Sequence, residues 1–214
     1  MRLLCLFLDH VLLSTRVVGQ QHLPRRGGVI LAGNHTGLVD GPVVLGASPR
    51  GAHFIMKYSL GQGLGGRILR AGGQVPVDQN NGRQALKTCL GLLERGQVVG
   101  IFPEGARGDG SMSEIKAGVA WLAVNSRAPV VPFACLGTRH EGEAITKMPR
   151  LRRKIYVSFG APVELDLDRE APAREQVAAA LEQIGAAMRV QVERAVAASG
   201  IPLPQDTGRE TKDD

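Results

Sequence analysis

Short, uninterrupted apolar runs recur along the chain. The clearest are VILA at 29–32, VVGIF at 98–102 and PVVPF at 129–133. Such runs are typical of strands buried on both faces of a parallel sheet, because a strand with one exposed face would alternate polar and apolar residues. Three further strands are predicted in HFIMK at 53–57, GQVPVD at 73–78 and KIYVSFG at 154–160.

Between these runs, apolar residues recur at helical spacing. Residues 82–95 place one apolar face on Ala85, Leu86, Cys89, Leu92 and Leu93. This spacing predicts an amphipathic helix, and Gly96 follows where the helix should end. Residues 113–126 predict a second helix with Ser113 as its N-cap, and residues 173–198 predict a long third helix.

Strands therefore alternate with helices, which predicts an α/β fold with a largely parallel β-sheet flanked by helices. No internal repeat or linker is visible, so residues 1–200 are predicted to form one domain. Residues 201–214 are polar with two prolines and are predicted to be a disordered, frayed tail. In such sheets, ligands bind at the carboxyl ends of strands. Two polar clusters follow predicted strands, NHTGLVD at 34–40 and PEGAR at 103–107.

The first 16 residues carry apolar side chains at helical spacing. They predict a short amphipathic helix at a membrane interface or, equally, a first helix that packs on its own domain. No run reaches the roughly 18 uninterrupted apolar residues that a spanning helix needs. No signal-peptide cleavage site follows the apolar run.

The chain of 214 residues has a net charge of +6 and a pI near 9.6. This balance suits an anionic partner, whether nucleic acid, an anionic membrane surface or a phosphorylated substrate. Aromatic residues make up 4% of the chain and no recognition motif is present, so we expect no nucleic-acid binding. Three widely spaced cysteines predict neither a disulfide framework nor a zinc site, and they fit a reducing compartment.

His35 and Asp40 are candidates for a base and its orienting carboxylate. A neutral imidazole accepts a proton at working pH, and it does so better when a carboxylate holds its other ring nitrogen. On a regular helix, five residues would separate the two side chains by about 140°. They can meet only if Gly37 and Gly41 allow a tight turn. The spacing alone also fits unrelated loop residues. No second histidine or cysteine stands at metal-ligand spacing, so no metal site is predicted.

The second cluster contains Glu104, Gly105 and Arg107. Arginine presents a fork of donors that matches a phosphate group, and glycine lets the backbone approach a bound molecule closely. The alternative is a polar turn in which Glu104 and Arg107 simply pair with each other.

The order of three motifs is more specific than any one of them. NHTGLVD, then FPEGAR at 102–107, then VVPF at 130–133 resembles the glycerolipid acyltransferases, the 1-acyl-sn-glycerol-3-phosphate acyltransferase family. The resemblance covers roughly residues 17–165 and implies a glycerol-3-phosphate acyltransferase-like fold. It also implies transfer of a fatty acyl group from acyl-CoA or acyl carrier protein to the free hydroxyl of lysophosphatidic acid, which gives phosphatidic acid. No cofactor is implied.

The resemblance also assigns roles to individual residues. His35 is the general base that deprotonates the acceptor hydroxyl, and Asp40 orients it. Glu104 positions the acceptor, Gly105 keeps the loop close to it, and Arg107 holds its phosphate. The family also carries a lysine at the position of Lys57, which is a further phosphate ligand by resemblance.

Three departures from the family pattern bear on these roles. Family members usually have arginine where this chain has Gln79, and that arginine is commonly assigned to the acceptor phosphate. Either Arg83 compensates, or the acceptor is not a plain phosphate monoester, for example a lyso-aminolipid. Ala106 replaces the usual threonine. The amino-terminal apolar region is short, which predicts peripheral attachment at the cytoplasmic side of the membrane.

Two alternative hypotheses about function also follow from the sequence. The acceptor could be a different one, a lyso-aminolipid or glycerol 3-phosphate in place of the lysophospholipid, or the chain could be a non-catalytic lipid-binding member of the fold. The basic run PRLRRK at 149–154 could contact anionic headgroups of a membrane surface, or it could be a solvated loop.

Overall fold

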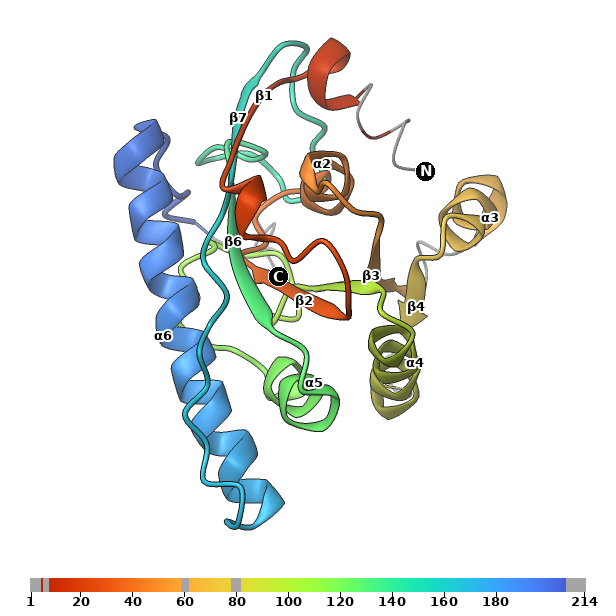
Figure 1. The fold of residues 1–214 in the computed structure, drawn as a ribbon. Coiled ribbons are helices and arrows are strands. Elements are labelled where there is room, and N and C mark those ends of the chain that lie inside the picture. Colours follow the sequence, from red (N-terminus) through yellow and green to blue (C-terminus); the bar gives the residue numbers. More distant parts are fainter. Residues whose placement is uncertain (1–4, 6–7, 59–61, 78–81, 207–214) are drawn as a thin grey trace, which may run out of the picture.

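The computed structural model describes residues 5, 8–58, 62–77 and 82–206 of the chain. Its strands are β1 (Ser14–Val18), β2 (Val29–Gly33), β3 (Ala52–Lys57), β4 (Val75–Val77), β5 (Val98–Ile101), β6 (Val130–Leu136) and β7 (Lys154–Phe159). They form one sheet in the order β1-β7-β6-β2-β5-β3-β4 (Figure 1). Every pairing is parallel except that of β6 with β7, so β1 and β7 run opposite to the other strands. The predicted largely parallel sheet is confirmed.

Helices cover both faces of the sheet (Figure 1). They are η1 (Leu8–Leu12), η2 (Gln20–His22), α2 (Asp40–Ala47), α3 (Gly63–Ala71), α4 (Gly82–Glu94), α5 (Gly118–Ser126) and α6 (Ala173–Ser199). Alternate residues of β2 enter different cores: Ile30 and Ala32 pack with α4, α5 and α6, whereas Val29 and Leu31 pack with α2. The apolar runs are therefore continuous because the central strands are buried on both sides.

Two helix predictions are confirmed and one is wrong at its start. Helices α4 and α6 match the predicted ranges, and Gly96 follows α4 with a φ of +75°. Helix α5, however, begins at Gly118, and Ser113 is exposed and caps nothing. The segment before α5 is a loop, in which Met112 has a φ of +60° and the Lys116 N–H donates to the Pro103 carbonyl oxygen at 2.9 Å.

The carboxyl-terminal segment is a second correction. Residues 201–206 are not a frayed tail: Leu203 packs against the core, and the Asp206 carboxylate lies 2.5 Å from Nη1 of Arg139. The Arg139 side chain is buried, so this ion pair holds the segment against the domain. Residues 207–214, which were also predicted to be disordered, lie outside the described residues.

The amino-terminal segment differs from the predicted helix over residues 1–16. Residues 1–4, 6 and 7 lie outside the description, and η1 is one π-helical turn that packs on α2. Residues 14–16 belong to β1, a strand that was not predicted, which pairs with β7. None of the helices in the described part of the chain is both long enough and apolar enough to cross a membrane.

Asp9 of η1 is buried against Gly46 of α2, and neither of its carboxylate oxygens has a hydrogen-bond partner among the described residues. Desolvation by burial raises the pKa of Asp9 to about 7. The folded protein therefore keeps a proton that the unfolded chain releases near pH 4. The stability that this proton contributes is complete below about pH 4 and is lost as the pH rises through about 7.

We expect Asp9→Asn to flatten the pH dependence of the unfolding free energy in this range, because an amide does not ionise. Between about pH 4 and pH 8, the wild-type protein should lose roughly 2–4 kcal/mol of unfolding free energy relative to the variant. Urea unfolding of both proteins across this range measures the difference. The amide leaves the same number of buried polar atoms, so the comparison isolates the charge. Parallel profiles would contradict the assignment.

Candidate active site

The site begins where β2 ends, at the carboxyl edge of the parallel strands. The Asn34 side chain joins this end to β6: its Nδ2 donates to the Cys135 carbonyl oxygen at 3.0 Å, and its Oδ1 accepts the Cys135 N–H at 2.8 Å. This pair of bonds fixes the backbone from which the next residue, His35, projects.

Asp40 is fully buried at the first position of α2, and the chain before it wraps around its carboxylate. Oδ2 accepts hydrogen bonds from Nδ1 of His35 at 2.8 Å, the Thr36 N–H at 2.7 Å and the Gly37 N–H at 2.9 Å. Oδ1 accepts a hydrogen bond from the Thr138 hydroxyl. Because residues 35–39 form a turn rather than a helix, the helical separation of about 140° does not apply. The structure therefore brings His35 and Asp40 together.

The contact with Asp40 sets the tautomer of His35. A carboxylate that receives four hydrogen bonds is an acceptor, so Nδ1 of the imidazole carries the proton. In the neutral ring, Nε2 is then left with a free lone pair, and no described residue donates to it. The His35 side chain is 20% exposed, so it is held from one side and remains accessible.

Phe102 provides the second support for the imidazole. Its ring lies parallel to that of His35, with centroids 4.1 Å apart and an interplanar angle of 16°. Phe102 in turn packs on Phe54 and Phe133. Hydrogen bonding at one ring nitrogen and stacking on one face together restrict rotation of the imidazole.

Glu104 contacts the same turn from the loop after β5. Its Oε1 accepts the His35 backbone N–H at 2.9 Å. Burial raises the pKa of Glu104 to about 7, although hydrogen bonds from backbone N–H groups oppose the shift. Gly105 follows with a φ of +74°, a conformation that side chains with a Cβ rarely adopt. The glycine therefore allows the loop to turn directly after Glu104.

Arg107 does not pair with Glu104 in the described residues. Its Nη1 donates instead to the Ile145 carbonyl oxygen at 2.7 Å, in the loop between β6 and β7. Lys57 is the last residue of β3, at the same carboxyl edge, and its side chain lies outside the description. Arg83 is exposed in the first turn of α4, which follows the carboxyl end of β4. Gln79 lies outside the described residues.

Comparison with known proteins identifies the family of the chain. A family model described as Acyltransferase matches residues 14–136, which is more than half of the chain. The chain belongs to the acyltransferase family. It is 31% identical over 175 residues to a 1-acyl-sn-glycerol-3-phosphate acyltransferase of Bacillus subtilis, with 80% of this chain and 84% of the relative covered.

Two further relatives of this acyltransferase are informative. A probable 1-acyl-sn-glycerol-3-phosphate acyltransferase of Mycoplasma pneumoniae is 26% identical, over 76% of this chain and 66% of the relative. The crystal structure of the 1-acyl-sn-glycerophosphate (LPA) acyltransferase PlsC from Thermotoga maritima superposes with a TM-score of 0.63 at 23% identity. The superposition covers 86% of this chain and 73% of the Thermotoga maritima chain. This likeness supports the fold that the sequence predicted.

The structure adds site residues that the sequence analysis missed. Thr138, directly after β6, hydrogen-bonds Asp40 and lies 3.2 Å, oxygen to oxygen, from the hydroxyl of Thr36. Arg139 donates through Nε to the Thr36 carbonyl oxygen and through Nη2 to that of Gly108. The buried arginine thus joins the turn that holds His35 to the loop that holds Glu104. The one signal in the sequence that could have indicated Thr138 and Arg139 is their position after β6, the strand that contains VVPF.

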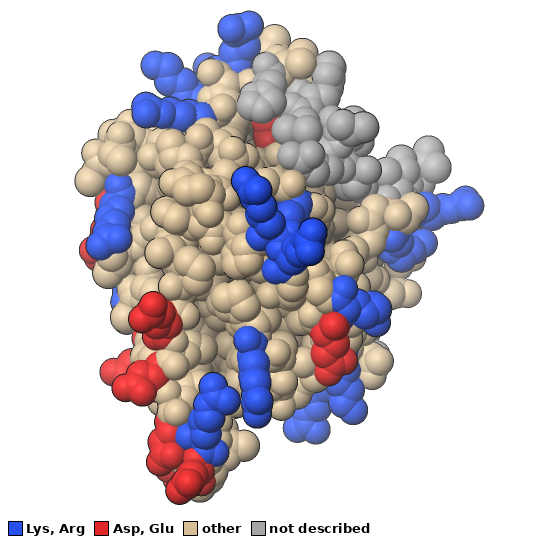
Figure 2. Space-filling view, viewed as in Figure 1, with Lys and Arg blue, Asp and Glu red and all other residues tan. Residues whose placement is uncertain are grey.

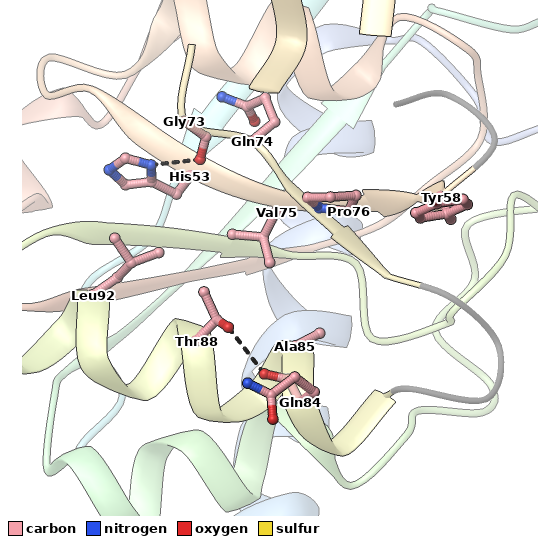
Figure 3. Close-up of a pocket in the computed structure, with 10 residues that line it drawn as sticks. All are labelled: His53, Tyr58, Gly73, Gln74, Val75, Pro76, Gln84, Ala85, Thr88 and Leu92. Carbon is pink, nitrogen blue, oxygen red and sulfur yellow. Dashed lines mark hydrogen bonds between the residues drawn. The ribbon is translucent and has the colours of Figure 1, made fainter. Parts of the chain in front are cut away.

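A hollow of about 600 Å³ lies elsewhere in this acyltransferase, between β4 and α4 (Figure 3). On one side of it, Nδ1 of His53 donates to the Gly73 carbonyl oxygen at 2.7 Å. The strands β5 and β3 separate β4 from β2, and none of the predicted site residues whose side chains the structure describes lines the hollow. Its lining consists of His53, Tyr58, Gly73, Gln74, Val75, Pro76, Gln84, Ala85, Thr88 and Leu92. We assign it no part in the chemistry of His35.

Proposed function

We propose that the protein transfers a fatty acyl group from an acyl thioester to the free hydroxyl of lysophosphatidic acid, which gives phosphatidic acid. The observation that carries the proposal is the His35–Asp40 pair, with Nδ1 held by a buried carboxylate and Nε2 open at the carboxyl edge of the sheet. The names of the Bacillus subtilis and Mycoplasma pneumoniae relatives support this acceptor.

In the proposed reaction, Nε2 of His35 takes the proton of the acceptor hydroxyl as its oxygen attacks the thioester carbonyl carbon. Asp40 stabilises the imidazolium that forms. The new C–O bond replaces the C–S bond, and the proton passes from His35 to the departing thiolate. A thioester is already activated, so the reaction needs neither a metal nor a covalent enzyme intermediate.

The acceptor phosphate is proposed to bind near the loop after β5. Arg107 keeps donors besides the Nη1 that is bonded to Ile145, and its guanidinium matches a phosphate oxygen pair. Lys57 is the last residue of β3 and Arg83 follows the carboxyl end of β4, on the same edge as His35, and both are proposed as further phosphate ligands. Glu104 supports the turn through the His35 N–H rather than through Arg107.

Gln79 favours a second candidate acceptor. An amide carries no charge, so the loss of the usual arginine weakens the case for a phosphate monoester and favours a lysolipid such as a lyso-aminolipid. Either acyl-CoA or acyl carrier protein is proposed as the donor, at the cytoplasmic side of a membrane. A non-catalytic lipid-binding role is the remaining alternative, and the intact pair of His35 and Asp40 argues against it.

An acceptor panel tests the proposal. Purified protein is given one acyl-CoA and, in turn, lysophosphatidic acid, glycerol 3-phosphate or a lyso-aminolipid, and products are identified by mass spectrometry. We expect phosphatidic acid to form fastest. A faster reaction with the lyso-aminolipid would select the second candidate. No product from acyl-CoA or acyl carrier protein donors, despite lipid binding, would overturn the enzymatic assignment.

A further inference from the structure

Two segments far apart in the sequence expose large apolar side chains next to each other. In η1, Val11 is 51% and Leu12 is 40% exposed, and in the loop between β6 and β7, Met148 is 57% and Leu151 is 70% exposed. The Arg152 N–H donates to the Leu12 carbonyl oxygen at 2.7 Å, so the two segments are joined. We call Val11, Leu12, Met148 and Leu151, with the cations around them, the loop–turn surface.

Cationic side chains surround these apolar residues. Arg16, Arg150, Arg152 and Lys154 are exposed on the two segments and on the strands that continue them. Figure 2 shows several Lys and Arg side chains at the end of the molecule where these segments lie, at the top of the view, whereas Lys and Arg are mixed with acidic side chains toward the opposite end.

The carboxylates of the same loop offset little of this charge. The Glu143 carboxylate accepts hydrogen bonds from Nη1 and Nη2 of Arg153, at 2.5 and 2.7 Å, and pairs with the Lys147 ammonium at 3.1 Å. These contacts hold the pKa of Glu143 well below its usual range, so Glu143 stays ionised and its charge is matched locally. Glu141 is the other acidic residue between β6 and β7. The loop–turn surface is therefore apolar and positively charged.

The loop–turn surface is attached to the candidate active site. Since β6 runs parallel to β2 and β7 runs antiparallel to β6, the loop that joins them lies at the carboxyl edge that carries His35. Thr138 and Arg139 at the start of this loop bond Asp40 and Thr36. Arg107 bonds the Ile145 carbonyl oxygen further along the loop.

We propose that the loop–turn surface docks the protein on an anionic lipid bilayer. Aliphatic side chains enter the headgroup region and gain from burial, while neighbouring cations are attracted to anionic headgroups. The apolar residues project from a loop and a turn rather than lining a groove, which favours a bilayer over an acidic protein partner. Docking there would turn the His35 edge toward the lipid phase, and this last step alone rests on the proposed function.

Vesicle sedimentation tests the docking without any acyl transfer. The full chain is mixed with vesicles of phosphatidylcholine alone or of phosphatidylcholine with phosphatidylglycerol. We expect salt-sensitive binding to the anionic vesicles. Met148→Asp/Leu151→Asp and, separately, Arg150→Gln/Arg152→Gln should each weaken binding about tenfold or more. Wild-type protein that stays in solution with anionic vesicles would overturn the proposal, as would either double variant binding like the wild type.

Matched controls come from α6, where Val190 is an exposed aliphatic residue and Arg189 and Arg194 are exposed cations. Val190→Asp and Arg189→Gln/Arg194→Gln should bind vesicles like the wild type, and equal losses in these controls would reduce the effect to general charge. Thermal unfolding shows that each variant is folded.

If acyl transfer is observed, the Met148→Asp/Leu151→Asp variant should keep turnover on a soluble short-chain acceptor and lose it on vesicle-bound acceptor. Absence of acyl transfer would sink the proposed function but leave the vesicle result intact.

Discussion

His35→Ala is expected to lower kcat for acyl transfer by about 10²–10⁴-fold, the usual contribution of a general base. The acceptor hydroxyl would have no group to take its proton as it attacks the thioester. The variant loses the stacking of the imidazole on Phe102 and its hydrogen bond to Asp40. The backbone N–H of residue 35 still donates to Glu104. The fold should therefore persist, and the loss should fall mainly on kcat rather than KM.

The measurement is steady-state kinetics with a soluble acceptor, so that membrane docking does not enter. His140→Ala is the matched control, because His140 is exposed and its hydrogen bonds within the described residues use the backbone alone: its N–H donates to the Glu143 carboxylate and its carbonyl oxygen accepts the Glu143 N–H. Added imidazole should restore part of the rate of His35→Ala, since the alanine leaves space for a free base in contact with Asp40. A folded His35→Ala protein with undiminished turnover would sink the proposed mechanism.

The sequence predicts most of the sheet because burial on both faces leaves a strong local signal. Strands β2, β5 and β6 are continuous apolar runs, and the amphipathic helix α4 was placed within a residue. Strand β1 was missed because STRVV continues an apolar segment with helical spacing, and its pairing with β7 is distant in the chain. The start of α5 was missed because Ile115 continues the helical spacing of Val119 and Leu122, whereas the contact from the Lys116 N–H to the Pro103 carbonyl oxygen, which belongs to a loop, leaves no local pattern.

The candidate site likewise contains residues that the sequence could identify and residues that it could not. His35, Asp40 and Glu104 could be selected because they occur in motifs directly after strands. Thr138 could not, because it lies 98 residues from Asp40 and a single hydroxyl after a strand is common. The contact between Arg107 and Ile145 also depends on how the β6–β7 loop folds over the site, which no local pattern encodes.

Asp40→Asn separates the charge of the carboxylate from its hydrogen bonds. The amide oxygen can take the place of Oδ2 and accept from His35, Thr36 and Gly37. The amide nitrogen then takes the place of Oδ1 and donates to the Thr138 hydroxyl, which reverses the direction of that bond. The turn and the tautomer of His35 should survive, so we expect the free energy of unfolding to change by less than about 1 kcal/mol.

The rate should nevertheless fall by about 10²–10³-fold, because no negative charge remains to stabilise the imidazolium that forms during proton transfer. Asp40→Ala should lose activity to a similar degree and also destabilise the fold by about 1–3 kcal/mol, since the Thr36 and Gly37 N–H groups lose their buried acceptor. Asp166→Asn on the surface is the matched control and should change neither quantity. Kinetics and urea unfolding of the three variants measure both effects. Full activity in Asp40→Asn would mean that Asp40 acts by geometry alone, and an unfolded Asp40→Asn protein would mean that the Thr138 hydroxyl cannot accept the reversed bond.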